Sequence, residues 1–276
     1  PFSLNGQANT KADYAQNRFG FILGGPLQFP KLFKTENTFF MINYNGSLIR
    51  NGTTLTSTVP TLAQRSGDFS ASGTVLYDPQ THLPLSGNRI AQINPIAQGL
   101  LAYIPLPNQP GLVNNYRLVT AVPNNNQSFN VRLMQTLSPR DQLAFGVSAQ
   151  TRDAENVQTF GFIDRTNGHG VNANVNYRHR FGSGAFQNLT GTFNRNTNTS
   201  NPFFANGANV AAALGIQGTS SNPMNFGPPN LNFTNFGALS DGSPSQSAVY
   251  SVGFSDTLGI RHGKHNFILE IGRAHV

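Results

Sequence analysis

The chain has 276 residues, of which 38% are hydrophobic and only 11% are charged, and both shares are below those of an average soluble protein. It contains no cysteine, which excludes disulfides and thiolate metal sites. The formal net charge is +7, but the basic residues are scattered without a Lys/Arg run, so we expect no nucleic-acid partner. No apolar run approaches the roughly 18 residues of a membrane helix.

Alternation of apolar and polar residues predicts about eight β-strands along the chain. Residues 1–16 are polar and irregular, and we interpret them as the end of a loop. The clearest unit is the segment 129–151, where two alternating runs flank a break at Ser138-Pro139-Arg140-Asp141, as in a β-hairpin. In chain order, the predicted strands cover residues 17–25, 37–47, 129–137, 142–151, 171–181, 187–196, 248–260 and 266–270.

The connections between these strands alternate between short and long. Long loops are predicted over 51–127, 152–170 and 197–246, with short helices at 61–65, 94–103 and 210–214. Outer-membrane barrels have short periplasmic turns and long extracellular loops, whereas a soluble β-sandwich has no reason to place its long loops at one end. We therefore predict an all-β fold, an antiparallel transmembrane β-barrel fragment of about eight strands in an open curved sheet. Residues 17–270 would form this part of the barrel.

Each predicted strand has one apolar and one polar face. The apolar residues suit contact with lipid, and the small amides, hydroxyls and arginines suit a wet lumen or a plug domain. The residues predicted to face the lumen or plug are Asn130, Arg132, Asn172, Asn174, Asn176 and Arg178. Those predicted to face lipid are Val131, Leu133, Phe145, Val147, Val175, Tyr177, Val252 and Phe254.

We find no pattern of catalytic, cofactor-binding or metal-ligating residues, so we expect neither an enzyme nor a cofactor. Gly20, Gly24 and Gly25 are not followed by a helix, so a crowded barrel wall explains them better than a phosphate loop. Asp68 and Ser70 suggest a turn or cap. Two groups of residues are of types that bind metals. His169, His179, His262 and His265 lack ligand spacing, whereas a calcium site at Asp153, Glu155 and Asp164 stays open.

The C-terminal segment 271–276 resembles one reading frame of a common sequencing adapter, and we interpret it as a non-native tail. The alternative is that these residues continue a genuine strand.

Several ordered blocks resemble a known family, the Oar-like TonB-dependent outer-membrane transporters. The strand blocks are Asn17-Arg18-Phe19-Gly20, Gly24-Gly25-Pro26 and Thr38-Phe39-Phe40. The loop blocks are Thr58-Val59-Pro60-Thr61, Arg65-Ser66-Gly67-Asp68-Phe69-Ser70, Tyr77-Asp78-Pro79, Ile93-Asn94-Pro95-Ile96-Ala97 and Pro105-Leu106-Pro107-Asn108. The resemblance covers most of the chain up to residue 269.

This resemblance implies a large barrel, about 22 strands by class, in the outer membrane of a Gram-negative-type bacterium. Its implied partners are the protein's own plug domain, the TonB complex through an upstream segment, membrane lipid and an extracellular solute. This sequence matches neither the plug nor the TonB-binding segment, so the resemblance implies that residues 17–270 are the early part of the barrel. Two functions stay open: import of a large or scarce solute, and a surface adhesin that binds without transport. A passive porin is disfavoured by the long loops.

Overall fold

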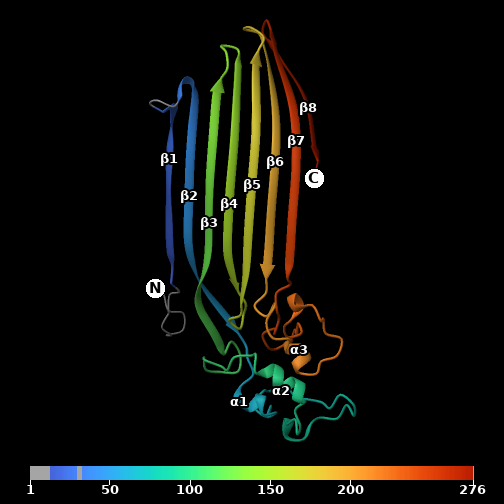
Figure 1. Cartoon of the computed structure of the whole chain (residues 1–276). Coiled ribbons are helices and arrows are strands. Elements are labelled where there is room, and N and C mark those ends of the chain that lie inside the picture. The colour runs from blue at the N-terminus through green and yellow to red at the C-terminus, as the bar shows by residue number, and fades with distance from the viewer. Residues whose placement is uncertain (1–12, 30–32, 276) are drawn as a thin grey trace.

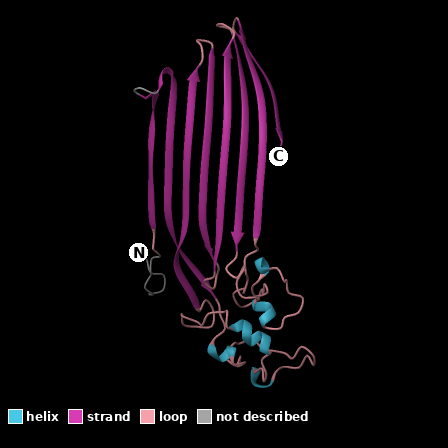
Figure 2. Ribbon diagram, viewed as in Figure 1, coloured by secondary structure: helices cyan, strands magenta, loops and turns pink. Residues whose placement is uncertain are grey.

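The computed structural model describes residues 13–29 and 33–275 and shows one antiparallel sheet of eight strands (Figures 1 and 2). Sequential strands are spatial neighbours throughout, which confirms the predicted all-β antiparallel fold. In the described ranges β1 and β8 are the two edges, so the sheet is open. The strands are β1 (Ala15–Phe29), β2 (Phe33–Ser57), β3 (Tyr116–Thr136), β4 (Asp141–Val157), β5 (Ile163–Arg180), β6 (Ala185–Asn201), β7 (Ser245–His262) and β8 (His265–His275).

The strands extend further than the hydrophobic pattern predicted, so the loop boundaries were wrong. The first long connection spans 58–115 rather than 51–127, and the third spans 202–244 rather than 197–246. The loop predicted over 152–170 is a short connection, 158–162. In part of these strand ends, as at Asn124–Asn126, both faces are polar, so alternation disappears while backbone pairing continues.

Five short helices lie in the long connections: α1 (Leu62–Arg65), η2 (Ser86–Asn88), α2 (Pro95–Leu101), α3 (Val210–Ala213) and η3 (Pro223–Asn225). They confirm the predicted helices at 61–65, 94–103 and 210–214. Thr61 forms a capping box with Gln64, and the Asn94 side chain accepts from the Ile96 amide at the start of α2. No helix within the described residues is long and apolar enough to cross a membrane.

Backbone pairing places the two sets of alternating residues on opposite faces of the sheet. Leu133, Phe145 and Val175 are directly paired across β3, β4 and β5, and all eight residues predicted to face lipid share this apolar face. The six residues predicted to face the lumen share the other, polar face. Contact of these faces with lipid and with the lumen stays a prediction.

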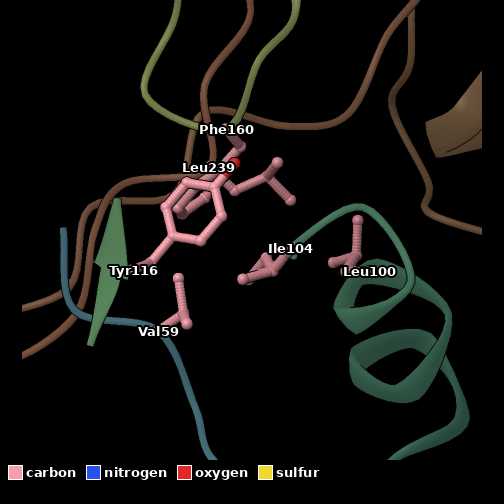
Figure 3. Packing of buried hydrophobic residues seen from close by; sticks show 6 residues of the cluster. All are labelled: Val59, Leu100, Ile104, Tyr116, Phe160 and Leu239. Atoms are coloured by element: carbon pink, nitrogen blue, oxygen red, sulfur yellow. The ribbon is translucent and has the colours of Figure 1, made fainter. Parts of the chain in front are cut away.

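The buried hydrophobic core lies beyond one end of the sheet rather than on it. Connections 58–115, 158–162 and 202–244 gather there, and we call them together the cap (Figure 1). A hydrophobic cluster joins them, formed by Val59, Leu100, Ile104, Tyr116, Phe160 and Leu239 (Figure 3). On the apolar face of the sheet, by contrast, Val175 and Phe254 are 45% and 57% exposed, so no second layer covers them in the described part of the chain.

β8 continues through residues 271–275, where His275 pairs with Val252. Within the segment interpreted as a non-native tail, the backbone of residues 271–275 therefore follows the strand.

Candidate functional site

Amide and hydroxyl side chains form a band across the polar face. Asn130, Ser148 and Asn172 are paired in line across β3, β4 and β5, and the line continues through Asn194 to Ser251. The Asn172 amide donates to Asn194, whose own amide donates to the Ser251 hydroxyl at 3.3 Å. The band therefore satisfies part of its own hydrogen-bonding capacity and offers the rest to a ligand or water.

Two adjoining grooves lie over this band. The larger groove has a volume of about 530 Å³ and is lined by two arginines and by amide and hydroxyl side chains. Its lining includes Arg132, Asn172, Asn174, Asn176 and Arg178. The smaller, of about 300 Å³, adjoins it and includes Asn130, Arg132, Asn172 and Asn174. The six residues predicted to face the lumen are thus brought together in two continuous grooves.

Arg178 is the most constrained side chain of this site. Its guanidinium lies over the Phe186 ring, 5.0 Å from the ring centroid. Its Nε atom is buried and has no hydrogen-bond partner. A buried donor without a partner costs free energy.

The cap is a second candidate site, because its three connections are fastened to one another. Asn115, which is fully buried, bonds both backbone polar groups of Val59. The Gly237 amide donates to the Thr58 carbonyl at 2.8 Å, which joins the third connection to the first. The Arg65 guanidinium donates to the carbonyls of Leu101, Ile104 and Pro105, which lie at and beyond the C-terminal end of α2.

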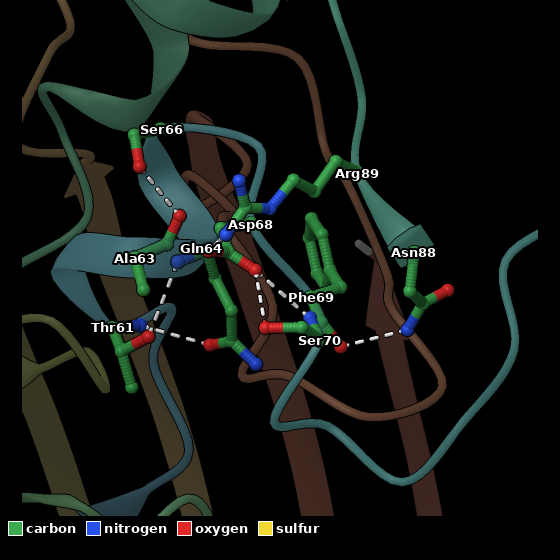
Figure 4. A network of polar contacts seen from close by, with 9 residues as sticks. All are labelled: Thr61, Ala63, Gln64, Ser66, Asp68, Phe69, Ser70, Asn88 and Arg89. Atoms are coloured by element: carbon green, nitrogen blue, oxygen red, sulfur yellow. Dashed lines mark hydrogen bonds and ion pairs between the residues drawn. The ribbon is translucent and has the colours of Figure 1, made fainter. Parts of the chain in front are cut away.

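Asp68 organises the outer part of the cap, as Figure 4 shows. Its carboxylate accepts from the hydroxyl and amide of Ser70 at 2.6 and 3.0 Å, and from Arg89 at 2.8 Å. The hydroxyl of Ser70, then its amide, hold the pKa of Asp68 below the ordinary value, and Arg89 contributes less. Asp68 and Ser70 therefore form a turn, as predicted, and Asp68 also bridges to Arg89.

The whole chain up to residue 269 matches one family, the outer membrane beta barrel domain. The chain belongs to this family. It is therefore part of an outer-membrane β-barrel of a Gram-negative bacterium. Among curated proteins and among solved structures, none matches the chain.

No group of three or more metal-binding side chains occurs in the described part of this barrel domain. Asp153 accepts from Asn167, Glu155 lies 3.6 Å from Arg165, and Asp164 accepts from Gln158 and the Phe203 amide. The three acids weighed as a calcium site thus have separate protein partners. Among the histidines, His179 lies 2.6 Å from the Asp141 carboxylate, an ion-pair geometry rather than a metal site.

The six residues predicted to face the lumen leave out Asn188, Thr190 and Thr192 of β6, which line the larger groove. The period of two on the predicted strand 187–196 places these three on the polar face, so the signal was present in the sequence. The cap core was also missed, since Val59 and Leu239 are 180 residues apart in sequence and neither lies in a periodic run. No local signal could have paired them.

Proposed function

We propose that this barrel domain belongs to a TonB-dependent transporter that binds and imports a large or scarce solute and catalyses no reaction. The observation that carries the proposal is the cap: three connections form one core at one end of the sheet. At the other end, the described turns of β3–β4, β5–β6 and β7–β8 are short. This asymmetry favours an outer-membrane barrel whose cap faces the cell exterior.

The resemblance to Oar-like transporters gains support from where its loop blocks fall. The block 65–70 lies in the Asp68 network, and the block 93–97 begins α2, which packs on the cap core. Both blocks therefore belong to one folded surface. This is the expected result if the resemblance to the family reflects a shared recognition surface. We propose that the cap receives the solute from outside.

The proposed partners follow from the two faces and the edges. The apolar face would contact lipid. Because unpaired backbone groups are costly in lipid, β1 and β8 need strand partners in a closed barrel. We propose that this barrel is wider than eight strands, that the protein's own plug fills the lumen, and that the TonB complex acts on an upstream segment. We propose no nucleic-acid partner.

The test is uptake of candidate large solutes by cells that express the full-length protein. We expect uptake to stop when the proton gradient is collapsed and when the upstream TonB-binding segment is deleted. Uptake that persists unchanged in both conditions would identify a passive pore and refute the proposal.

One observation favours a second function, surface adhesion. The cap exposes large apolar side chains, with Tyr77 61%, Leu83 65% and Val113 70% exposed. Such residues could contact another macromolecule. Binding at the cell surface without any energy-dependent uptake would support the adhesin.

A further inference from the structure

The arginines on the polar face of strands β1–β7 form no ion pair. We call these arginines the arginine track. The three ion pairs of the described chain involve Arg89, Arg165 and His179, none of which belongs to the track. The track consists of Arg18, Arg132, Arg152, Arg178, Arg180 and Arg261.

Three grooves carry these arginines from the cap end of the sheet to the turn end. A groove of about 790 Å³ near the cap includes Arg18 and Arg152. The groove of about 530 Å³ contains Arg132 and Arg178. A third, of about 460 Å³ beside the short turns, contains Arg178, Arg180 and Arg261. Volumes of this size suit small-molecule ligands.

The backbone register sets the spacing along the track. Arg152 is level with Gly168 of β5, and Arg132 is level with Asn174 through Gly146. Since a strand rises about 3.3 Å per residue, the levels of Arg152, Arg132 and Arg178 are about 20 Å and then about 13 Å apart along the strands. Arg132 and Arg178 are also two strands apart, about 10 Å across the sheet.

Acidic side chains are nearly missing from the polar face of the described strands. Asp164 lies at the cap end, where the Gln158 side chain and the Phe203 amide already bond its carboxylate. Glu270 lies on β8 in the same row of paired residues as Arg178. The row runs through Asn188 and Thr257, so Glu270 is three strands away from Arg178. The track therefore makes the polar face electropositive, since Asp164 and Glu270 are the only acidic residues on this face of the described strands.

We propose that the arginine track binds a solute that carries two or more carboxylates, and that this class of solute is what the protein imports. Only the import step rests on the proposed function. Guanidinium groups bind carboxylates through paired hydrogen bonds, and the intervening asparagines suit hydroxyl or amide groups between the charges. Arg178 contributes such a guanidinium group to the lining of the larger groove.

The binding test uses trigalacturonate, an oligomeric carboxylate of suitable reach, and isothermal calorimetry on the full-length protein in detergent. We expect saturable binding whose affinity falls at high salt. Each of Arg132→Gln and Arg178→Gln should lower the affinity about tenfold. Arg195→Gln is the matched control, because Arg195 lies on β6 on the opposite face, over the Tyr250 ring. That change should leave binding unaltered.

Two further ligands separate charge from shape. The fully methyl-esterified, neutral form of trigalacturonate should bind at least about tenfold more weakly. Inorganic phosphate, with a single oxyanion, should also bind more weakly. Arg132→Lys, which keeps the charge and the fold but loses the paired geometry, should fall between wild type and Arg132→Gln. Equal binding of the neutral and charged forms, or tighter binding of phosphate, would overturn the proposal.

Failure of this inference can be told apart from failure of the proposed function. If the protein takes up neutral solutes in an energy-dependent way, and none of the arginine substitutions changes the uptake rate, then the proposed role of the arginine track is wrong but the proposed transport function stands. Arginine-dependent binding of trigalacturonate without energy-dependent uptake would support the track and refute import.

Discussion

Asn115 holds both backbone polar groups of Val59. The Val59 amide donates to Asn115 Oδ1 at 2.7 Å, and Asn115 Nδ2 donates to the Val59 carbonyl at 2.9 Å. Both residues have 0% exposure, so water cannot replace either bond. This pair ties the beginning of the first long connection to its end, next to the core that the other two connections complete.

We expect Asn115→Leu to loosen the whole cap. The change leaves the buried amide and carbonyl of Val59 without partners, which costs about 1–3 kcal/mol for each group. Limited proteolysis of outer-membrane vesicles should cleave connection 58–115 faster than in the wild type. Asn225→Ala is the control, because Asn225 is exposed and bonds only at the cap surface. Equal cleavage of the two variants would contradict this role of Asn115.

The two faces of β5 should respond differently to a new charge. Val175 lies on the apolar face between Phe145 and Gly191, whereas its neighbour Asn174 lies on the polar face between Gly146 and Thr192. If the apolar face contacts lipid near the bilayer midplane, Val175→Arg should cost about 2–4 kcal/mol of folding free energy, and Asn174→Arg much less. A folding titration of the full protein into lipid vesicles measures both. Equal costs would show that the faces are not exposed to different environments.

The orientation of the barrel can be tested with two epitope tags. Gly73 lies exposed in the cap with φ +69°, and Ser183 lies exposed in the β5–β6 turn at the opposite end of the sheet. A tag at Gly73 should be reached by antibody on intact cells, and a tag at Ser183 only after the outer membrane is opened. Reversed labelling would invert the proposed topology.

The sheet was predictable from the sequence where one face is apolar, and the cap was not. The apolar residues from Val171 to Tyr177 alternate strictly with asparagines, so the period of two identified this part of β5 and the residues that share each face. At Asn124–Asn126 that signal is lost, although the backbone ladder continues. Asn115 illustrates the second limit. Its place in the cap depends on a contact with Val59 over 56 residues of loop, which no local pattern encodes.

The last prediction concerns pH and the carboxylate of Asp241 in the cap. Burial raises the pKa of Asp241 above its ordinary value and the nearby Asp164 adds to this, against hydrogen bonds from Gly242 and Gln158. The folded cap therefore binds a proton more tightly than the unfolded chain does. Its contribution to stability is greatest at low pH and is lost as pH rises from the ordinary value through the raised one.

We therefore expect Asp241→Asn to stabilise the cap at neutral pH, with the gain disappearing below about pH 4. Hydrogen exchange of the Gly237 and Leu239 amides, corrected for intrinsic rates, reports cap opening because both bond within the cap.

Asp78 provides a control of opposite sign. Amide hydrogen bonds from Thr81 and then Gln80 lower the pKa of the Asp78 carboxyl. Its stabilising contribution is therefore present above the ordinary pKa and is lost as pH falls through the lowered one. Asp78→Asn should weaken protection of its own turn at neutral pH and leave Gly237 unaffected. If Asp241→Asn reduces protection of Gly237 and Leu239 at pH 7, then the Asp241 carboxylate stabilises the cap and the argument from burial is wrong.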